Sequence, residues 1–382
     1  MLFLGFALML GFASCEDDPI DTDPIITDDT NPDDDSDPVV TAECFDIVDL
    51  DTYFDVIQTV CFINPEEGWL VGQDSDDNTT DILAHTADGG LTWSVVNTDL
   101  KLFHTGSVSA PYIDFYNSTD GYLIGEYEYV TGGYGGNPLK YTTDKGQTWS
   151  EIADVAYGTW DVVAVNSTDA VFIGHTVYGY HNNCVLYKVS NATHEITQTV
   201  ELPISLEFFA KVDMNLSEDR VINVPVSSVD IGPGLYMARS NDFGATWTYI
   251  AIDLEYIYNI DFPTNNTGYV IGEIDGSDLF LCKTTDGGLT WTNKPLNLSL
   301  GEFFIHHDFF DAQNGLGIIY GAIYKTTDGA ETWTKVSCIS DSDHTPTRGV
   351  AYVSLDKWYA IGNRYNSAED ETHSEFLIYE EE

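Results

Sequence analysis

Basic residues are scarce in this chain: 14 Lys and Arg stand against 63 Asp and Glu, a formal net charge of −49 at pH 7. Such a charge repels phosphate backbones and anionic lipid head groups, so we expect no nucleic-acid partner and no direct binding to a membrane surface. A saline habitat, solubility and cation binding are each compatible with this acidity, and composition does not separate them.

Sequence signals of catalysis and of zinc binding are also missing. There is no C-x-x-C pair, no His/Cys cluster, no Ser/His/Asp motif, no phosphate loop and no Rossmann fingerprint. Cys15 apart, five cysteines remain, and an odd number leaves at least one unpaired within the chain. Export permits a disulfide, and Cys44 with Cys338 is the one pairing that we expect. No cofactor is implied; calcium stays open.

What the chain does contain is an eight-residue box that recurs. Its pattern is a Thr or Ser, an Asp two residues later, a Gly or Ala, and Thr-Trp at the end. The five copies are residues 86–93, 142–149, 240–247, 284–291 and 326–333. Their Asp and Trp residues are Asp88 and Trp93, Asp144 and Trp149, Asp242 and Trp247, Asp286 and Trp291, and Asp328 and Trp333.

Each box lies between two short runs of β-type residues. Asp-Gly between such runs favours a hairpin turn, because Gly tolerates positive φ and Asp accepts hydrogen bonds from local backbone N–H groups. The Thr or Ser can add a side-chain-to-backbone bond, and the Trp offers a large apolar face. A metal-binding or acid–base role for the aspartates is the alternative. We favour the structural interpretation, because a residue at the same place in every repeat is what a shared scaffold needs.

The spacing of the boxes gives the number of repeats. The aspartates are 56, 98, 44 and 42 residues apart, and 98 is close to two repeats, so one box has decayed; residues 185–191 fit the lost strand and turn. A seventh repeat without a box follows, and residues 45–50 are a strand without a partner that we expect to close the ring. Nothing in residues 41–382 has helical periodicity.

Periods of 40–50 residues with four short strands each predict an all-β fold, a seven-bladed β-propeller of four-stranded antiparallel blades whose ring is closed by an N-terminal strand. The blades are expected at about 54–97, 106–152, 158–202, 208–250, 256–294, 302–337 and 347–382.

The box matches the Asp-box of the BNR-repeat proteins, which are β-propellers. The wider repeat, with Gly-Tyr-x-x-Gly-Glu some fifteen residues before the box, resembles the Ycf48-like propellers named for photosystem II assembly. That family is associated with a basic patch, which this chain lacks. The resemblance therefore covers the repeats of residues 54–337 and does not identify a site.

The N-terminus resembles an export signal. Residues 1–15 are an apolar run too short to span a bilayer, ending in Phe-Ala-Ser-Cys, which is similar to a bacterial lipobox and makes Cys15 a lipidation site. A plain secretory signal is the alternative. The positively charged start of a signal is missing, which is compatible with a start upstream. Residues 16–40 hold eleven acids and no base, and we expect a disordered tether.

Acids directly after the cysteine resemble surface-export signals of Bacteroidetes lipoproteins. We therefore expect an exported monomer, lipid-anchored to the cell envelope at the outer membrane and exposed at the surface.

The binding face is expected in the variable loops, because the loops at the ends of the blades opposite the boxes lie together on one face of a propeller. These loops are rich in aromatic residues, whose flat apolar faces and polar tips suit a protein or glycan partner. The candidates are Tyr127, Tyr129, Tyr134, Trp160, Tyr178, Tyr180, His181, His306, His307, His344 and Arg348. Packing of the loops is the alternative role for each. Asp114, Asp213 and Asp261 fall at equivalent inner-strand positions, where a strand–turn hydrogen bond is favoured over cation binding.

The Asp-box also occurs in sialidases, which raises an enzymatic alternative. A site resembling theirs needs three arginines on the substrate carboxylate, and this chain has four in all, with none in the first blade. We therefore expect a non-enzymatic scaffold that binds a protein or glycan, with a glycoside hydrolase of the sialidase-like group as the alternative.

Overall fold

The computed structural model describes the following residues: 46–50, 53–74, 81–100, 113–124, 128–130, 134–136, 138–153, 159–164, 168–178, 181–205, 215–216, 221–227, 234–274, 278–294, 304–319, 322–336, 345–366 and 371–380. All the regular structure in these residues is β-strand. They contain no helix of the length and apolarity that crossing a membrane requires. The cysteines of the expected Cys44–Cys338 pair lie outside the described residues, and Cys61, Cys184 and Cys282 are free thiols.

The strands form seven four-stranded antiparallel sheets, the blades, numbered here along the chain. Blade 1 is β2 (Phe54–Phe62), β3 (Gly68–Asp74), β4 (Asp81–Thr86) and β5 (Ser94–Leu100); blade 2 is β6 (Ile113–Phe115), β7 (Gly121–Ile124), β10 (Leu139–Thr142) and β11 (Ser150–Glu151). Blade 3 is β12 (Thr159–Ala164), β13 (Asp169–Tyr178), β14 (His181–Ser190) and β15 (Ile196–Ser205); blade 4 is β16 (Asn215–Leu216), β17 (Ile222–Ser227), β18 (Leu235–Ser240) and β19 (Thr248–Ile252).

Blade 5 is β20 (Tyr256–Asp261), β21 (Gly268–Ile274), β22 (Asp278–Thr284) and β23 (Thr292–Lys294); blade 6 is β24 (Phe304–Phe309), β25 (Gly315–Ile319), β26 (Ala322–Thr326) and β27 (Thr334–Lys335). Blade 7 is β28 (Thr345–Ser354), β29 (Lys357–Asn366), β30 (Glu371–Glu380) and β1 (Asp46–Asp49). A separate two-stranded hairpin, β8 (Glu128–Val130) with β9 (Tyr134–Gly136), is inserted in blade 2.

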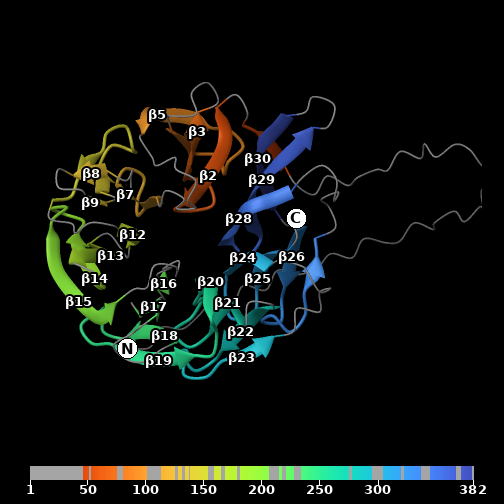
Figure 1. Ribbon diagram of the computed structural model, residues 1–382. Helices are drawn as coiled ribbons and strands as arrows, with labels where there is room; N and C mark the ends of the chain where they lie inside the picture. Colours follow the sequence, from red (N-terminus) through yellow and green to blue (C-terminus); the bar gives the residue numbers. More distant parts are fainter. Residues whose placement is uncertain are drawn as a thin grey trace, which may run out of the picture. The chain divides into compact units, whose positions relative to one another are not determined.

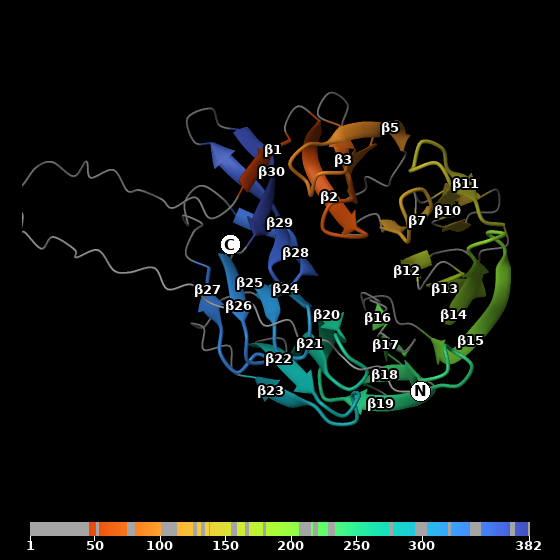
Figure 2. The same cartoon turned by 180° about the vertical axis from the view of Figure 1, so that it is seen from behind.

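The blades stand side by side around a ring, with the first strand of each blade innermost and the fourth strand outermost (Figures 1 and 2). Innermost strands of neighbouring blades contact each other, as β20 does β24 and β24 does β28. The predicted seven-bladed β-propeller is therefore confirmed.

The hydrophobic core is divided into clusters that lie between blades. The described residues form seven clusters of buried apolar side chains, and each one combines residues of two neighbouring blades. A single blade therefore has no core of its own, and the ring is stable only when every blade contacts two neighbours. All seven clusters lie within residues 42–382, which form one compact unit.

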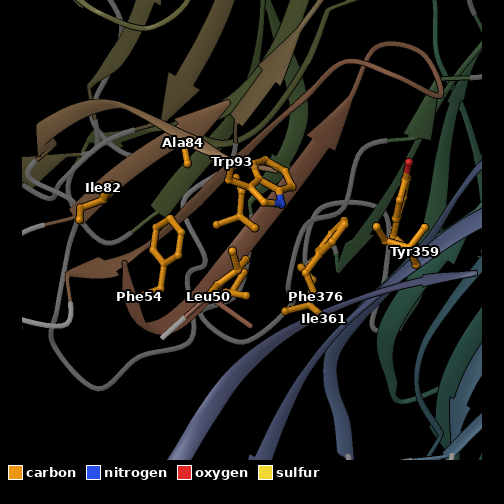
Figure 3. Close-up of a cluster of buried hydrophobic side chains, with 11 residues drawn as sticks. Leu50, Phe54, Ile82, Ala84, Trp93, Tyr359, Ile361 and Phe376 are labelled. Atoms are coloured by element: carbon orange, nitrogen blue, oxygen red, sulfur yellow. The ribbon is translucent and has the colours of Figure 1, made fainter. Parts of the chain in front are cut away.

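The ring closes where the two ends of the propeller meet. β1 pairs antiparallel with β30, with Val48 opposite Phe376, so an N-terminal strand completes the last blade as predicted. Where blade 7 meets blade 1, Leu50 and Phe54 pack with Tyr359 and Phe376 of blade 7 (Figure 3). The pairing removes an open edge strand and joins the two ends without a covalent bond.

A repeated aromatic contact joins one blade to the next. Phe309, at the end of the first strand of blade 6, stacks on Tyr269 of blade 5 with ring centroids 3.5 Å apart and an interplanar angle of 2°. The same strand position holds Phe115, which stacks on Trp69 at 3.8 Å, and Phe62, which stacks on Tyr359 at 4.3 Å. The aromatic residue near the start of the second strand, which is Trp69, Tyr269 or Tyr359, is therefore the surface on which the next blade packs.

Glycine makes this stacking geometrically possible. Gly315 lies opposite Phe309 in the pairing of β24 with β25, and a Cβ at Gly315 would lie 2.4 Å from the Phe309 ring. Gly68, Gly121 and Gly268 are in the same relation to the Phe of their own blades. The phenylalanine ring occupies the space above the glycine, so a side chain at the glycine position would push the phenylalanine out of the aromatic stack.

Candidate functional site

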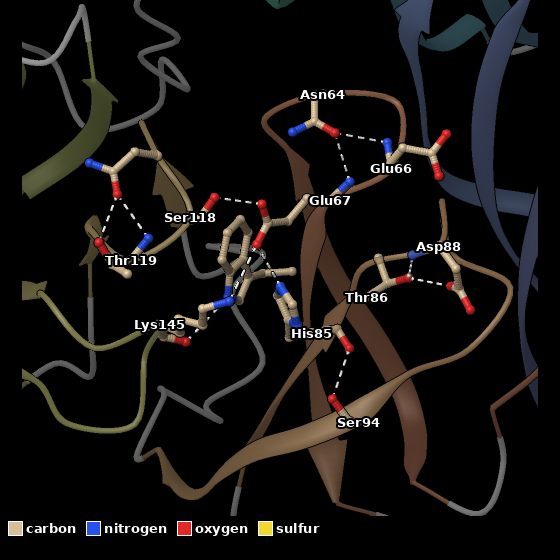
Figure 4. Close-up of polar contacts among 12 residues, drawn as sticks. Asn64, Glu66, Glu67, His85, Thr86, Asp88, Ser94, Ser118, Thr119 and Lys145 are labelled. Carbon is tan, nitrogen blue, oxygen red and sulfur yellow. Dashed lines mark hydrogen bonds and ion pairs between the residues drawn. The ribbon is translucent and has the colours of Figure 1, made fainter.

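The boxes are hydrogen-bonded turns that connect the third and fourth strands. In the box of blade 5, Thr284 Oγ1 donates to Asp286 Oδ1 (2.8 Å) and accepts from Gly288 N (2.8 Å). Thr290 donates to Asp286 from its backbone N (2.9 Å) and from its hydroxyl (2.7 Å). The same four bonds recur in the boxes of Asp88, Asp144, Asp242 and Asp328, and Figure 4 shows Thr86 beside Asp88.

These bonds keep the box carboxylates ionised. The hydroxyl of Thr246 lowers the pKa of Asp242 to about 2, and that of Thr332 lowers the pKa of Asp328 to about 2. A carboxylate that is saturated with local hydrogen bonds and ionised at neutral pH is suited to fixing a turn and unsuited to donating a proton. The Trp residues pack inward, as Trp333 does against Phe309 in an edge-to-face contact.

The boxes of blades 1, 2, 5 and 6 also lie against the turn that joins the first two strands of their own blade. Gly89 N donates to Glu66 O, Gly287 N to Asn266 O and Gly329 N to Gln313 O, each at 2.8 Å. Both turns therefore lie at one end of the blades, the box side. The other end, from which the first strand of each blade starts, is the loop side.

The third blade has no box, and its turn makes a different contact. After β14, a short turn places Asn191, which is buried, where its Oδ1 accepts a 2.6 Å bond from the Tyr122 hydroxyl of blade 2. His194 in this turn has a φ of 55° and stacks on Tyr141 at 3.8 Å. The junction of blades 2 and 3 is therefore held without the box.

On the box side, the few basic residues bond to neighbouring blades. Arg239 Nη2 donates to Asn265 O (2.6 Å), from blade 4 to blade 5, and Lys283 Nζ donates to Gly329 O (2.8 Å), from blade 5 to blade 6. Lys294 pairs with Glu331 across the same junction. These cations serve to join blades.

The junction of blades 1 and 2 uses a polar cluster around Glu67 (Figure 4). Glu67 contacts His85 Nε2 (3.0 Å), accepts from Ser118 Oγ (2.6 Å) and lies 3.6 Å from Lys145 Nζ. Burial raises the pKa of Glu67, but the bonds from Ser118 and His85 outweigh it and hold the pKa below its usual range. Serine and histidine both contact the glutamate and not each other, so the cluster is not a nucleophile–base pair.

Inner-strand side chains bond across blades as well. Asp261 Oδ2 accepts from Phe309 N (2.6 Å), Asp308 Oδ2 accepts from Tyr352 N (2.7 Å), and the Cys61 thiol accepts from Phe115 N (3.5 Å). The bond at Asp261 Oδ2 runs to the backbone of the next blade, and the strand–turn bond favoured for Asp261 stays a prediction. Asp114 accepts from the Cys61 thiol at 3.5 Å, and Asp213 lies outside the described residues.

His307, which precedes Asp308 in β24, is 2% exposed. Burial lowers the pKa of His307 to about 3, so its imidazole is neutral at pH 7. Burial raises the pKa of Asp308 to about 6. Among the described residues, no group of three His, Cys, Asp or Glu side chains converges as a metal site would require.

On the loop side, the innermost strands share a β-bulge. Between the first and second strands, the register skips Gln58, Trp160, Tyr258 and Ile305, and it skips residues 347–348 in β28. The first four of these residues lie four positions before Phe62, Ala164, Phe262 and Phe309, respectively. In four of these five blades the bulge lies opposite the second Gly of the Gly-aromatic-x-x-Gly pattern or its equivalent: Gly72, Gly174, Gly272 and Gly362. Bulges redirect side chains and are frequent beside functional sites.

Two bulge residues have described side chains. Tyr258 is 43% exposed and its hydroxyl donates to Glu273 Oε2 (2.8 Å); Gln58 Nε2 donates to Asp81 Oδ1 (3.2 Å), and Asp81 is buried. Gln58 and Asp81 were not among the sequence candidates. The signal that could have found Gln58 is its position, four residues before Phe62 and opposite Gly72.

The sequence candidates for the binding face are only partly described. Tyr127, Tyr180 and His344 lie outside the described residues. Backbone positions alone are described for Tyr129 in β8, Tyr134 in β9, Trp160 in β12, Tyr178 in β13, His181 in β14 and Arg348 in β28. Trp160 and Arg348 both fall at bulges. His306 is partly exposed and His307 is buried, both in β24.

Comparison with known proteins agrees with this architecture. A seven-bladed propeller built from boxed BNR repeats is the class that the fold and the box geometry define. Residues 239–357 match the sequence profile of the family described as "Photosynthesis system II assembly factor YCF48". The chain is 31% identical over 146 residues to the "Photosystem II assembly lipoprotein Ycf48" of Synechococcus sp. (strain CC9902). Over these parts of its length the chain is thus similar to the Ycf48 proteins.

The match spans part of each sequence, 35% of this chain and 41% of that relative. Similar solved structures include a YCF48 bound to a D1 peptide (TM-score 0.59, 17% identity, covering 89% of this chain and 96% of that one) and YCF48 from Cyanidioschyzon merolae (TM-score 0.57, 14%, 88% and 98%). A PL25 ulvan lyase has a TM-score of 0.55 at 10% identity, covering 86% and 96%. At these identities the structural matches show the fold alone.

Proposed function

We propose that this chain is a non-enzymatic scaffold of the cell envelope that binds a segment of a protein partner at the loop side of the ring. Two relatives support a protein partner: one is named an assembly lipoprotein, and one solved YCF48 holds a peptide. The partner of those proteins is not carried over to this chain.

The observation that carries the proposal is the shared bulge. Five blades place an extra residue at the same level of the innermost strand, but those residues differ in chemistry: Gln, Trp, Tyr, Ile and, in β28, the Thr-Arg pair of residues 347–348. The bulge sets the course of the backbone and leaves the side chain free to differ from blade to blade. Residues of different chemistry at the loop side of the ring give the alternating apolar and polar contacts that a polypeptide segment needs.

The described side chains at this level favour a cationic segment. Tyr258 offers an exposed ring whose hydroxyl is bonded to Glu273, and a ring beside a carboxylate suits a Lys or Arg side chain. The net charge of −49 would also steer a cationic segment toward the propeller.

An enzyme would need a carboxyl group that can carry a proton to the substrate at neutral pH. Asp308 is the described carboxyl with a raised pKa, and its Oδ2 accepts a hydrogen bond from Tyr352 N at the blade junction. The box carboxylates have lowered pKa values. Both sets of carboxyls support the non-enzymatic proposal over a glycoside hydrolase.

The proposal also includes the anchor: Cys15 carries the lipid, and residues 16–40 tether the propeller to the outer membrane with the ring facing outward. The name of the Synechococcus relative, a lipoprotein, supports lipidation. More than one acyl chain is needed for stable attachment of such an anchor.

The experiment uses the propeller, residues 41–382, immobilised and exposed to solubilised envelope of the parent cell. Wild type, Tyr258→Ala and Val95→Ala are compared, because Val95 is exposed on the outermost strand β5, away from the loop side. We expect one protein to be retained by wild type and Val95→Ala and reduced at least fivefold by Tyr258→Ala. Equal retention by all three would contradict a loop-side site. Cleavage of a polysaccharide by the same preparation would favour the hydrolase.

A further inference from the structure

Exposed apolar side chains gather on the box side of four consecutive blades. Among the described residues, Leu289 of blade 5 is 64% exposed, Phe310 of blade 6 is 45%, Leu355 of blade 7 is 41% and Leu91 of blade 1 is 52%. Leu289 and Leu91 lie in boxes, and Phe310 and Leu355 lie in turns between first and second strands. We call these four residues the box-side apolar arc.

The blades that carry the arc are direct neighbours in the ring (Figure 1). Contacts between β20 and β24, β24 and β28, and β28 and β2 join blades 5, 6, 7 and 1 in that order. On the box side itself, the Phe310 ring lies 5.8 Å from the Tyr352 ring of blade 7, and the Tyr359 hydroxyl of blade 7 donates to Gly89 O of the blade 1 box (3.1 Å). The four residues of the arc therefore lie on blades that adjoin one another at three successive junctions.

The scaffold does not require these apolar residues. Leu91 and Leu289 fill the box position just before the Thr-Trp pair, where the other boxes have Gln147, Ala245 and Glu331. The box hydrogen bonds are the same in all five copies, so this side chain does not contribute to the turn. Leu at the position in blades 1 and 5 only, on the side where Phe310 and Leu355 are also exposed, calls for a reason other than folding.

The surroundings of the arc are anionic. Asp88, Asp286 and Asp328 are ionised box carboxylates on these blades. Of the described lysines on these blades, Lys283 donates to Gly329 O, Lys294 pairs with Glu331, and Lys357 pairs with Glu380. Lys325 and Lys335 flank the box of blade 6. An apolar arc in an anionic field suits a partner with apolar residues flanked by Lys or Arg.

We infer that the box-side apolar arc is a second docking surface, separate from the loop side, and that its occupant is a cationic amphipathic segment of a protein. Charge excludes the other occupants. A second copy of this chain also carries −49, and an anionic membrane would be repelled in the same way. A segment with Leu along one face and Lys along the other would cover the apolar residues and neutralise the carboxylates together.

The probe for this surface is a synthetic helical peptide of Leu and Lys with the two residue types on opposite faces, and its control has Glu in place of every Lys. Binding to residues 41–382 is measured by fluorescence anisotropy at physiological salt. The first variant pair is Phe310→Ser with Leu355→Ser. The second is Leu91→Gln with Leu289→Gln, which copies Gln147 of the blade 2 box and is therefore compatible with the turn. Neither pair changes the net charge.

We expect each variant pair to weaken binding of the Lys peptide at least tenfold, and we expect the Glu peptide not to bind. Unaltered binding by both pairs would overturn the inference, because the peptide would then bind by charge alone. Equal loss in the loop-side variant Tyr258→Ala, or binding of the propeller to neutral phosphatidylcholine vesicles that the same pairs abolish, would overturn it too. Tyr258→Ala, the loop-side variant, should bind the peptide as wild type does, so failure of one surface does not affect the test of the other.

Discussion

Replacing Gly315 by Ala tests the contact on which blade-to-blade packing rests. The new Cβ would lie 2.4 Å from Cε1 of Phe309, about 1 Å closer than an ordinary van der Waals contact. The ring cannot move away, because it stacks on Tyr269 at 3.5 Å on one side and packs against Trp333 on the other. Overpacking of this kind costs about 1–3 kcal/mol of unfolding free energy.

The assay is urea unfolding followed by tryptophan fluorescence, with two glycine controls. Gly349→Ala adds a Cβ with nothing within 4 Å and should change stability by less than about 0.5 kcal/mol. Gly234→Ala also meets no neighbour, but its φ of 125° is a conformation that alanine rarely adopts, so it should destabilise through the backbone.

A double-mutant cycle separates the clash from other effects of the new methyl group. In a Phe309→Leu background the ring is gone, so the added cost of Gly315→Ala should fall below about 0.5 kcal/mol. The reasoning would be refuted if Gly315→Ala were as stable as Gly349→Ala, or if its cost were the same with and without the Phe309 ring.

Three further predictions concern the boxes, the seam and the anchor. The pKa of Asp328 is about 2 in the folded chain against 3.8 without its bonds, so its stabilisation is present at pH values above 3.8 and is lost as the pH falls from there through 2. The urea midpoint should therefore drop between pH 5 and pH 2, and less so in Asp328→Asn. Tyr359→Phe removes the hydroxyl that donates to Gly89 O at 3.1 Å and should lower stability by about 0.5–1.5 kcal/mol in the same urea assay. Cys15→Ser should abolish lipid labelling and move the protein from the detergent to the aqueous phase on Triton X-114 partition; unchanged partition would exclude a lipid at this residue.

The repeat allowed the fold to be predicted, because each part of it has a local cause. Asp-Gly fixes the hairpin turn, Trp supplies apolar area, and the recurrence of both gives the number of blades. Closure by residues 46–49 could be predicted because the last repeat has three strands and this strand had no partner.

Contacts between blades were beyond the sequence, because they depend on which residues of one repeat face the next. Nothing local indicates that Asp261 bonds to Phe309 N in the following blade, or that the Tyr122 hydroxyl reaches Asn191. The bulges could have been inferred in part, since the second Gly of the repeat lies opposite them, but a register shift is visible only once two strands are paired. The sequences of the variable loops do not repeat from blade to blade, so the repeat pattern does not predict their side-chain contacts.

The central claim, that this Ycf48-like propeller binds a protein at its loop side, is tested most directly by photo-crosslinking in the parent cell. A photoreactive amino acid is placed at Tyr258 on the loop side and, as the control, at Val95 on the outermost strand. We predict a protein adduct of one defined mass from position 258 that is absent from position 95. The account would be contradicted if both positions gave the same adducts or if position 258 gave none.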